Sequence, residues 1–302
     1  MTYDCIIIGG GIGGLQASIQ LGRYNRKVLT IDAGEGRSTL CRKYNNILGF
    51  PNGVSGKELR QAGVTQAKGL GVEFLNDEVT RLHKEPEGFT VAVEKGSLFK
   101  AKTVLLATGV KDNLPAIPGM KECLGLSLYI CPDCDGYEIM DKKTIVIGSG
   151  DAGAAMAEVI HYWSEDIIYI NHDGADVSKK RRLAMENRNI LVQNERIEKV
   201  NHQNGSIGSV ETAGGKVIKA EKGFLAFGGN KVQSKLASKL GAEMNEKHHL
   251  IIDSRTKMTS VPDLWAAGDI AAHSELVTAA MGEGAIAAIW IQKRLLKGTP
   301  SV

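Results

Sequence analysis

Two cysteines separated by two residues are the part of this sequence best suited to chemistry. Cys131 and Cys134 flank a Pro-Asp dipeptide, and Asp135 follows at once. Thiols at this spacing can close a small disulfide ring. At the start of a helix the dipole lowers a thiol pKa, which raises the fraction of attacking thiolate. The sequence therefore predicts a pair that cycles between disulfide and dithiol.

Asp135 is a candidate general acid for these sulfurs, because burial beside them would raise its pKa. An aspartate that only caps a helix is the alternative. No metal site is expected, because zinc ordinarily needs a second pair of ligands. The other thiols are scattered along the chain, at Cys5, Cys41 and Cys123.

Two glycine-rich turns are suited to holding phosphate groups. Both fit the pattern G-x-G-x-x-G, at Gly9, Gly11 and Gly14 and again at Gly148, Gly150 and Gly153. The first glycine permits the tight turn, the second lets a pyrophosphate approach the backbone, and the third lets helix and strand pack closely. The pyrophosphate then lies on the helix N-terminus. Two turns predict two dinucleotides, usually a flavin and a nicotinamide nucleotide, although a degenerate second turn is the alternative.

The elements around the turns repeat. A strand at 3–8, a helix at 15–24 and a strand at 27–31 return as 144–147, 154–163 and 167–170. This is an internal repeat of the nucleotide-binding βαβ module, and each copy starts a parallel sheet. Asp32 ends the first copy, where it can accept a hydrogen bond from an adenosine ribose.

The remaining segments complete two domains. We expect β-meanders over 89–101 and 197–220, a buried strand at 103–109, and helices at 231–240 and 276–296. The tail has no glycine turn of its own, so we expect it to complete the first domain. The predicted fold class is α/β, with two Rossmann-like domains, each a parallel sheet with a β-meander, the second inserted into the first. The domains are 1–115 with 245–302, and 116–244.

Composition narrows the class of protein. The 302 residues are 43% hydrophobic and carry a net charge of +3, which is too small to argue for a nucleic-acid partner. The basic run Lys179–Arg182 is explained by a solvated helix face. We expect the N-terminus to be a strand rather than a signal peptide, and no stretch reaches the roughly 20 apolar residues of a membrane span. We expect a cytoplasmic protein without a membrane partner.

The chain resembles the low-molecular-weight thioredoxin reductases over essentially its whole length. The motifs that carry the resemblance occur in one order along the chain: Gly9–Gly14, Asn46, Gly49–Pro51, Gly53, Ser55-Gly56, Ala107–Gly109, Cys131–Gly136, Gly148–Gly153 and Ala267–Asp269. Each glycine motif alone is weak, but the ordered set is specific.

The resemblance implies a homodimer that binds FAD in the first domain and NADPH in the second, which also carries the cysteine pair. It implies that a domain rotation presents either the disulfide or the nicotinamide to the flavin. Cys134 would lie nearer the flavin, and Cys131 would attack a thioredoxin-like protein or another disulfide substrate. Asp269 would contact the ribityl chain of the flavin. The expected cofactor-binding residues are Gly9, Gly11, Gly13, Gly14, Asp32, Asn46, Thr108, Gly109, Gly148, Gly150, Asp151, Gly153, Asp173, Gly268 and Asp269.

Three segments depart from the family pattern. The His-Arg-Arg that clamps the 2′-phosphate of NADPH is replaced by Asn171-His172-Asp173. An aspartate suits a ribose 2′-hydroxyl and repels a phosphate, so we expect NADPH to be favoured over NADH by no more than about tenfold. A Gly-Gly-Gln stretch is replaced by Gly34–Ser38, and an Arg-Gln pair reads Glu275-Leu276. These changes leave the identity of the disulfide substrate open.

The predicted function is an FAD-dependent disulfide oxidoreductase that passes electrons from NADPH or NADH through Cys131 and Cys134 to a protein disulfide. A dithiol oxidase that uses oxygen is one alternative. Fungal enzymes of that kind share the fold but typically carry histidine where this chain has Asp135. A reductase with a decayed nicotinamide site and another electron donor is the second alternative. A flavin-bearing redox sensor without turnover is the third.

Overall fold

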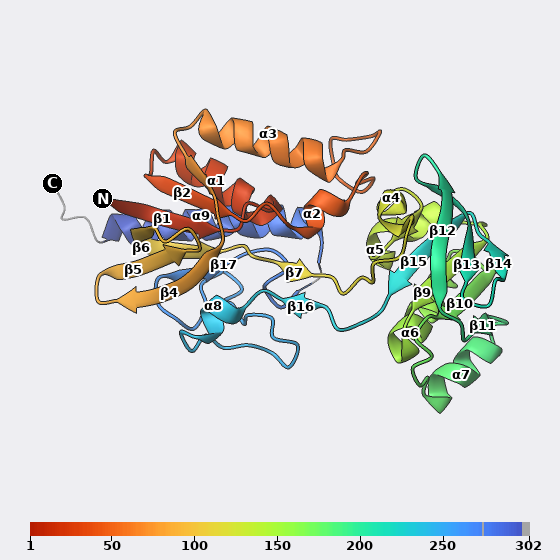
Figure 1. Cartoon of the computed structure of the whole chain (residues 1–302). Helices are drawn as coiled ribbons and strands as arrows, with labels where there is room; N and C mark the ends of the chain where they lie inside the picture. Colours follow the sequence, from red (N-terminus) through yellow and green to blue (C-terminus); the bar gives the residue numbers. More distant parts are fainter. Residues whose placement is uncertain (274, 298–302) are drawn as a thin grey trace. The chain divides into compact units, whose positions relative to one another are not determined.

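The computed structural model describes residues 1–273 and 275–297, and the chain packs as two compact units. Unit 1 contains Met1–Thr39, Gly56–Lys111 and the chain from Lys231 onward, and unit 2 contains Leu40–Ser55 and Asp112–Asn230 (Figure 1). The chain thus leaves unit 1 twice, and Leu40–Ser55 packs with unit 2. The assignment of one cofactor to 1–115 with 245–302 and the other to 116–244 stays a prediction.

Unit 1 is built on a sheet of order β3-β2-β1-β6-β5-β4, with β17 beside β6. The strands are β1 (Thr2–Ile8), β2 (Val28–Asp32), β3 (Glu73–Asn76), β4 (Val79–Glu85), β5 (Gly88–Val93), β6 (Leu98–Leu106) and β17 (Leu264–Ala266). The first half of β6 pairs antiparallel with β5, and its second half pairs parallel with β1 and β17. One strand therefore belongs to both the meander and the parallel sheet, where the sequence predicted two segments.

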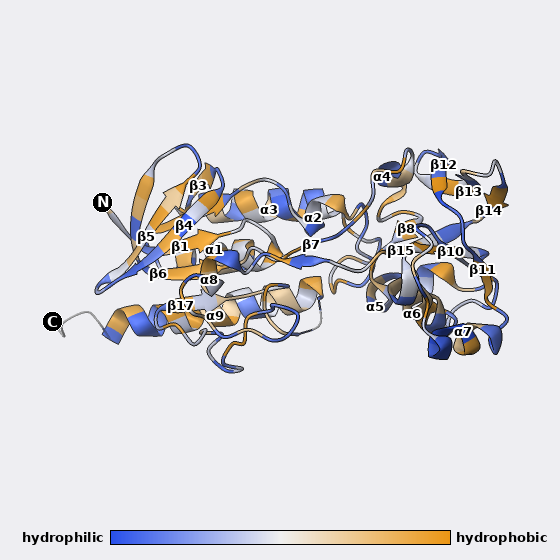
Figure 2. Ribbon diagram, turned by 60° about the horizontal axis from the view of Figure 1, so that its bottom comes forward, coloured by the Kyte–Doolittle hydropathy of each residue, from blue (hydrophilic) through white to orange (hydrophobic). Residues whose placement is uncertain are grey.

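Side chains on the two faces of this sheet enter different layers. Cys5 and Ile7 face helices α1 (Ile12–Arg23), α3 (Gly56–Lys68) and α9 (Val277–Lys297). Ile6 and Ile8 face the meander and residues of the later segment 237–250. Because alternate residues of a strand point to opposite faces, the unbroken apolar run of β1 fits a strand that is buried on both sides. Figure 2 shows the hydrophobic colour along β1 and β6, and blue patches on α3 and on α7 (Lys179–Glu186).

The predicted helix at 231–240 is wrong over its first residues. Lys231–Val232 forms β16, which pairs antiparallel with β7 (Val110–Lys111), and only Lys235–Ser238 is helical, as α8. The Gln233 N–H also donates to Gly109 O, at 2.9 Å. Tertiary pairing between segments distant in sequence has overridden a local helical pattern.

Unit 2 has a parallel sheet of order β11-β10-β9-β15-β8 and a separate three-stranded meander. The sheet strands are β8 (Leu128–Tyr129), β9 (Thr144–Gly148), β10 (Ile167–Asn171), β11 (Leu191–Gln193) and β15 (Lys222–Ala226). The meander strands are β12 (Ile197–Gln203), β13 (Ser206–Thr212) and β14 (Val217–Lys219). The helices are α4 (Met120–Cys123), α5 (Pro132–Asp135), the 3-10 turn η1 (Gly136–Ile139), α6 (Gly150–Ile160) and α7 (Lys179–Glu186).

The two faces of the second sheet are covered by different layers. Ile145 and Ile147 contact the meander and α4, while Val146 and Tyr169 contact α6 and α7. Each unit thus has a parallel sheet covered on both faces by other layers, and the predicted α/β fold class is confirmed. Arg37–Leu40 forms the short helix α2 after β2.

Helices α1 and α9 approach each other through two glycines. A Cβ added at Gly284 would lie 2.2 Å from the carbonyl oxygen of Gly13. At Gly282, two residues earlier on the same helix, no atom of the described chain lies within 4 Å of an added Cβ.

We predict that Gly284→Ala destabilises the protein by about 1–3 kcal/mol, because the added methyl group overpacks the crossing. Gly282→Ala should be neutral or stabilising by up to about 1 kcal/mol, since alanine is the better helix former. Thermal unfolding followed by circular dichroism measures both changes. Equal melting temperatures for the two variants would contradict the close crossing.

Candidate active site and cofactor turns

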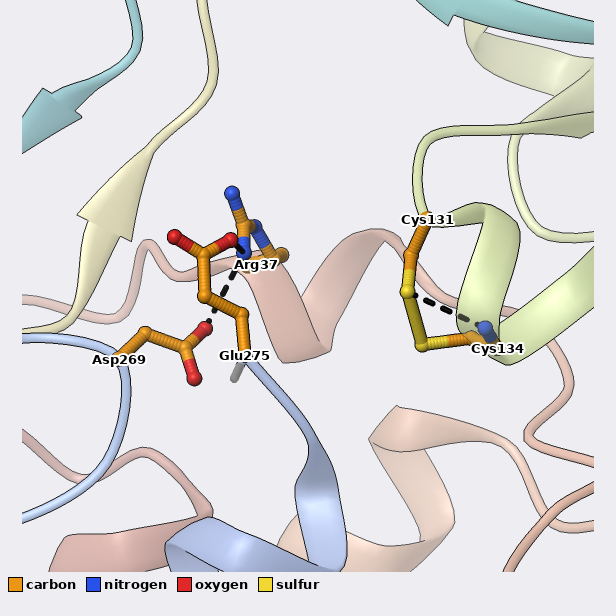
Figure 3. Close-up of a disulfide and its surroundings, with 5 residues drawn as sticks. All are labelled: Arg37, Cys131, Cys134, Asp269 and Glu275. Carbon is orange, nitrogen blue, oxygen red and sulfur yellow. Dashed lines mark hydrogen bonds and ion pairs between the residues drawn. A yellow bond between two sulfur atoms is a disulfide. The ribbon is translucent and has the colours of Figure 1, made fainter. Parts of the chain in front are cut away.

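Cys131 and Cys134 form a disulfide at the start of α5, with Cα atoms 5.3 Å apart (Figure 3). Cys131 is the N-cap residue in an extended conformation, and its Sγ accepts the Cys134 N–H at 3.2 Å. Pro132 takes the first helical position, where a missing N–H costs nothing. The helix that we expected here is a single turn followed by a 3-10 turn. Its dipole is therefore small, and the direct N–H bond is the contact that favours negative charge on Cys131.

Asp135 follows the disulfide directly and is half-buried. The pKa of its carboxyl is raised to about 7, because burial and, to a smaller extent, the negative charge of Glu138 raise it more than Lys222 lowers it. A carboxyl with this pKa holds a proton near neutral pH and can release it, as a general acid must. Asp135 also precedes η1, but within the described chain its side chain makes no capping hydrogen bond. This geometry favours the acid over the helix cap.

The first glycine turn contains one glycine that the packing of the protein does not require. Gly9 has φ +106°, and a Cβ there would lie 2.3 Å from Ala107 O. A Cβ at Gly14 would lie 2.0 Å from Gly9 O. Gly11 has an ordinary φ of −72°, and the nearest described atom to its added Cβ is 3.9 Å away. An open glycine at this position fits a turn that a pyrophosphate approaches.

Asp32 lies at the end of β2 beside this turn. Its Oδ1 accepts the Gly10 N–H at 3.0 Å, and its Oδ2 pairs with Arg60 Nη2 at 2.6 Å. Arg60 also donates to Ser38 Oγ at 3.3 Å. The carboxylate is thus fixed where a ribose is expected. Sequence reasoning missed Arg60, which lies on α3 with nothing in its local pattern to mark it.

Two further turns at the ends of parallel strands carry predicted residues. After β6, Thr108 Oγ1 donates to Gln233 O at 2.8 Å, and Gly109 has φ +64°. After β17, Gly268 has φ +79° and donates its N–H to Glu283 at 3.0 Å. Gly13 packs at the α1–α9 crossing. These turns share one edge of the sheet with Gly9–Gly14, because carboxyl ends of parallel strands meet there.

Glu283 on α9 is a buried carboxylate that sequence reasoning missed. Burial opposes its ionisation, but the hydrogen bond and charge of His273, the Gly268 N–H and Lys257 outweigh burial and lower its pKa. The Nε2 of His273 lies 2.7 Å from Glu283, and Lys257 Nζ lies 3.2 Å away. An acid among the small residues of α9 is the signal that could have identified it. Glu283 fixes the turn that presents Asp269.

Arg37 joins two segments that depart from the family pattern. Its Nη1 lies 3.2 Å from Asp269 Oδ2 and also contacts Glu275 Oε2 (Figure 3). Glu275 in turn lies 3.6 Å from His249 Nε2. Arg37 and Glu275, which replace other residues of the family pattern, therefore pair with each other.

The second glycine turn has the same spacing but a different backbone. Added Cβ atoms at Gly148 and Gly153 would lie 2.4 Å from Ala226 O and 2.3 Å from the Tyr169 ring. Gly150 has φ +47°, and its added Cβ would lie 2.9 Å from Asp176 O. Here all three glycines are required by the protein itself. The loop after β10 lies against the turn that we expect to hold the nucleotide.

Asn171 holds this arrangement together from a buried position. Its Oδ1 accepts the Gly150 N–H at 3.0 Å, and its Nδ2 donates to Ala175 O and Asn194 Oδ1 at 2.8 and 3.0 Å. Nearby, Asp151 Oδ1 accepts the Ser178 N–H at 2.7 Å. Polar side chains around the second turn thus form hydrogen bonds with the loop that follows β10.

The exposed Asp173 lies just beyond β10, with Oδ2 accepting the Ser149 hydroxyl at 2.8 Å. Asn46 is also exposed and lies in Leu40–Ser55, which packs with unit 2. The structure therefore does not group Asn46 with the first glycine turn. Its role with a cofactor stays a prediction, as do the roles of the other predicted cofactor residues.

The described residues contain neither a candidate metal site nor a candidate membrane span. Across 1–273 and 275–297, no group of three or more His, Cys, Asp or Glu side chains could hold a metal ion. Over the same ranges, no helix is both long and apolar enough to span a membrane.

Comparison with known proteins identifies the family. Residues 3–284 match the pyridine nucleotide-disulphide oxidoreductase family. A thioredoxin reductase of Treponema pallidum is 29% identical over 297 residues, which cover 95% of each chain. The crystal structure of HlmI superposes with a TM-score of 0.86 at 28% identity, covering 98% of this chain and 93% of that one. A putative thioredoxin reductase of Bacillus anthracis gives a TM-score of 0.84 at 26% identity, with coverage of 98% and 99%.

The chain therefore belongs to the pyridine nucleotide-disulphide oxidoreductase family. Within that family its resemblance to the low-molecular-weight thioredoxin reductases is confirmed over nearly the whole chain. It is an enzyme of the disulfide oxidoreductase type, and the family implies FAD and a pyridine nucleotide as cofactors.

We predict that Arg37 and Glu275 are energetically coupled. Arg37→Met leaves two carboxylates side by side, so removing Glu275 in the same chain should relieve part of the damage. In a double-mutant cycle with Glu275→Gln, thermal unfolding should give a coupling of about 0.5–1 kcal/mol, as expected for a partly exposed pair.

A matched control uses the Arg294–Asp263 pair near the other end of α9, where the two side chains lie 2.6 Å apart. Arg294→Met combined with Glu275→Gln should be additive. Coupling as large as that of the Arg37 pair would mean that the cycle reports a general electrostatic effect.

Proposed function

We propose that this enzyme reduces a protein disulfide with electrons from a reduced pyridine nucleotide, through bound FAD and the Cys131–Cys134 pair. One observation carries the proposal: a closed disulfide is followed directly by a carboxyl whose pKa is raised to about 7. A structural disulfide has no need of a neighbouring acid, whereas a disulfide that opens and closes must exchange protons.

Asp135, Cys131 and Cys134 have different roles in the proposed reaction. FAD, when bound, would take two electrons from the nucleotide and pass them to the disulfide. As the disulfide opens, Asp135 donates a proton to the thiolate that leaves. In the second half-reaction the Cys131 thiolate attacks the substrate disulfide, and Cys134 closes the ring on Cys131. The protein dithiol is thereby oxidised, and the substrate leaves with two thiols.

Support for the substrate class comes from the relatives. Their names describe reductases of thioredoxin, which favours a thioredoxin-like protein as the partner of this chain. We include in the proposal the homodimer that the resemblance implies. Neither the oxygen-dependent dithiol oxidase nor the reductase with a decayed nicotinamide site receives support from the comparisons.

We predict that Cys131→Ser and Cys134→Ser each abolish thioredoxin reduction and leave flavin reduction by the nucleotide largely intact. The pair is needed only after electrons have reached the flavin. Turnover with thioredoxin and the bleaching of flavin absorbance separate the two half-reactions.

Cys41→Ser is the matched control. Burial raises the pKa of the Cys41 thiol to about 11, so this thiol is not a nucleophile near neutral pH. The Cys41→Ser variant should reduce thioredoxin at the parent rate. Parent rates in either variant of the pair would show that the disulfide is structural.

The choice of nucleotide follows from the charges beyond β10. Asp173 presents a carboxylate beside Ser149, which suits a ribose 2′-hydroxyl. His172 does not offset this charge. Its Nδ1 accepts the Ile197 N–H at 3.0 Å, which fixes the neutral form, and burial and then Arg196 lower its pKa.

The two arginines of α7 are directed to other partners. Arg181 Nη1 binds Glu158 at 2.9 Å, and Arg182 Nε donates to Val177 O at 2.7 Å. A 2′-phosphate normally needs bidentate arginine contacts to offset its desolvation. We therefore propose that this enzyme favours NADPH over NADH by no more than about tenfold.

We predict a kcat/KM ratio of NADPH to NADH below about ten at low ionic strength, equivalent to less than about 1.4 kcal/mol. Asp173→Arg should move the ratio toward NADPH by about tenfold or more. Asp176→Arg, the same charge change on an exposed residue of the same loop, should move it much less.

A strong NADPH preference in the parent enzyme would show that another group binds the phosphate. Equal effects of the two substitutions would mean that the adenosine end lies elsewhere. Very slow reduction by both nucleotides would contradict the nucleotide-dependent function itself.

A further inference from the structure

Charged groups from two elements of unit 2 act on the acid beside the disulfide. Asp135 interacts electrostatically with Glu138 on η1 and with Lys222 at the start of β15. Cys41, from Leu40–Ser55, and Tyr129 on β8 also feel its charge. Glu138 and Lys222 are therefore the ionised groups that bear directly on Asp135.

Lys222 is held in place by two hydrogen bonds. Its Nζ donates to Leu126 O at 3.0 Å and to Tyr129 Oη at 2.8 Å, and it lies 5.3 Å from the centroid of the Tyr129 ring. Tyr129 Oη itself donates to Leu126 O at 2.6 Å. A lysine without a role would extend its ammonium into water, whereas this one lies half-buried against the strand that leads to Cys131.

The surroundings of Lys222 destabilise its positive charge in part. Burial lowers its pKa, Glu138 and Asp135 raise it, and Lys142 and Lys43 lower it. The partners that stabilise the charged ammonium are therefore the carboxyls of Asp135 and Glu138. Both belong to the segment 131–139, which we call the redox turn. Glu138 is itself held from the other side, where its Oε1 accepts Asn45 Nδ2 at 2.9 Å.

We propose that Lys222 is a positioning residue for proton transfer at the Cys131–Cys134 disulfide, acting on Asp135 across the redox turn with Glu138 as its counterpart. The inference rests on the proposed function in one respect only, that the disulfide opens and closes. No assignment of residues to either cofactor enters it.

The two charges act on Asp135 in opposite directions. The ammonium stabilises the carboxylate, so Lys222→Met should keep Asp135 protonated to higher pH. The Glu138 carboxylate stabilises the protonated form, so Glu138→Gln should release the proton at lower pH. With both removed, burial alone remains, and the two changes should largely cancel.

The experiment follows the carboxyl signal of Asp135 by ¹³C NMR in the oxidised holoenzyme, assigned by its loss in Asp135→Asn. The parent should titrate near pH 7. We predict a midpoint about one unit higher in Lys222→Met and about one unit lower in Glu138→Gln, because each variant removes a charge that acts on the Asp135 carboxyl. The high-pH limb of disulfide turnover, measured with 5,5′-dithiobis(2-nitrobenzoate), should move the same way.

Two controls separate charge from structure. Lys222→Arg keeps the charge and should keep the parent midpoint, while Lys219→Met removes an exposed lysine on β14 and should change nothing. If Lys222→Met fails to fold, Lys222→Gln removes the same charge with a polar side chain and should raise the midpoint in the same way. Unmoved midpoints in folded variants would overturn the inference. Retained turnover in the cysteine variants would instead overturn the proposed function and leave the titration result standing.

Discussion

The arrangement of both glycine turns depends on backbone contacts that a side chain would block. The third glycine of the first turn, Gly14, would place a Cβ 2.0 Å from Gly9 O, and its counterpart Gly153 would place one 2.3 Å from the Tyr169 ring. These contacts let a helix begin directly against a strand end. Free N–H groups of the helix then face the edge where polar side chains from neighbouring strands end. Every candidate cofactor residue at that edge depends on this approach.

Most of this architecture can be predicted from local sequence patterns. The predictions are wrong where segments that are distant in sequence pair with each other. Strand, glycine turn and helix were predictable in both copies, because each requirement lies within a few residues. The backbone of the second turn was not, since it depends on Asn171 reaching Gly150 from the next strand. Lys231–Val232 was misread as helix for the same reason, because its partner β7 lies far away in sequence. Periodicity reports the local preference and not the pairing that overrides it.

In the candidate site, too, features set by neighbouring residues were predictable and features set by distant contacts were not. Cysteine spacing was enough to predict the disulfide, and Asp135 followed from adjacency. Arg37 and Glu275 are 238 residues apart, and each alone looked like a loss of a family residue. Together they form an ion pair that also includes Asp269. A compensating pair cannot be recognised in one sequence without its contacts, because each substitution gains its meaning from the other.

The redox turn illustrates why a buried acid needs charges of both signs around it. Burial disfavours the carboxylate, and a neighbouring Glu138 disfavours it further, so these two alone would keep Asp135 protonated well beyond neutral pH. Such an acid would donate one proton and could not readily release the next. An ammonium alone would have the opposite fault and hold the carboxylate ionised. With Lys222 opposing burial and Glu138, the pKa stays at about 7, where the same group can donate a proton when the disulfide opens and accept one when it closes.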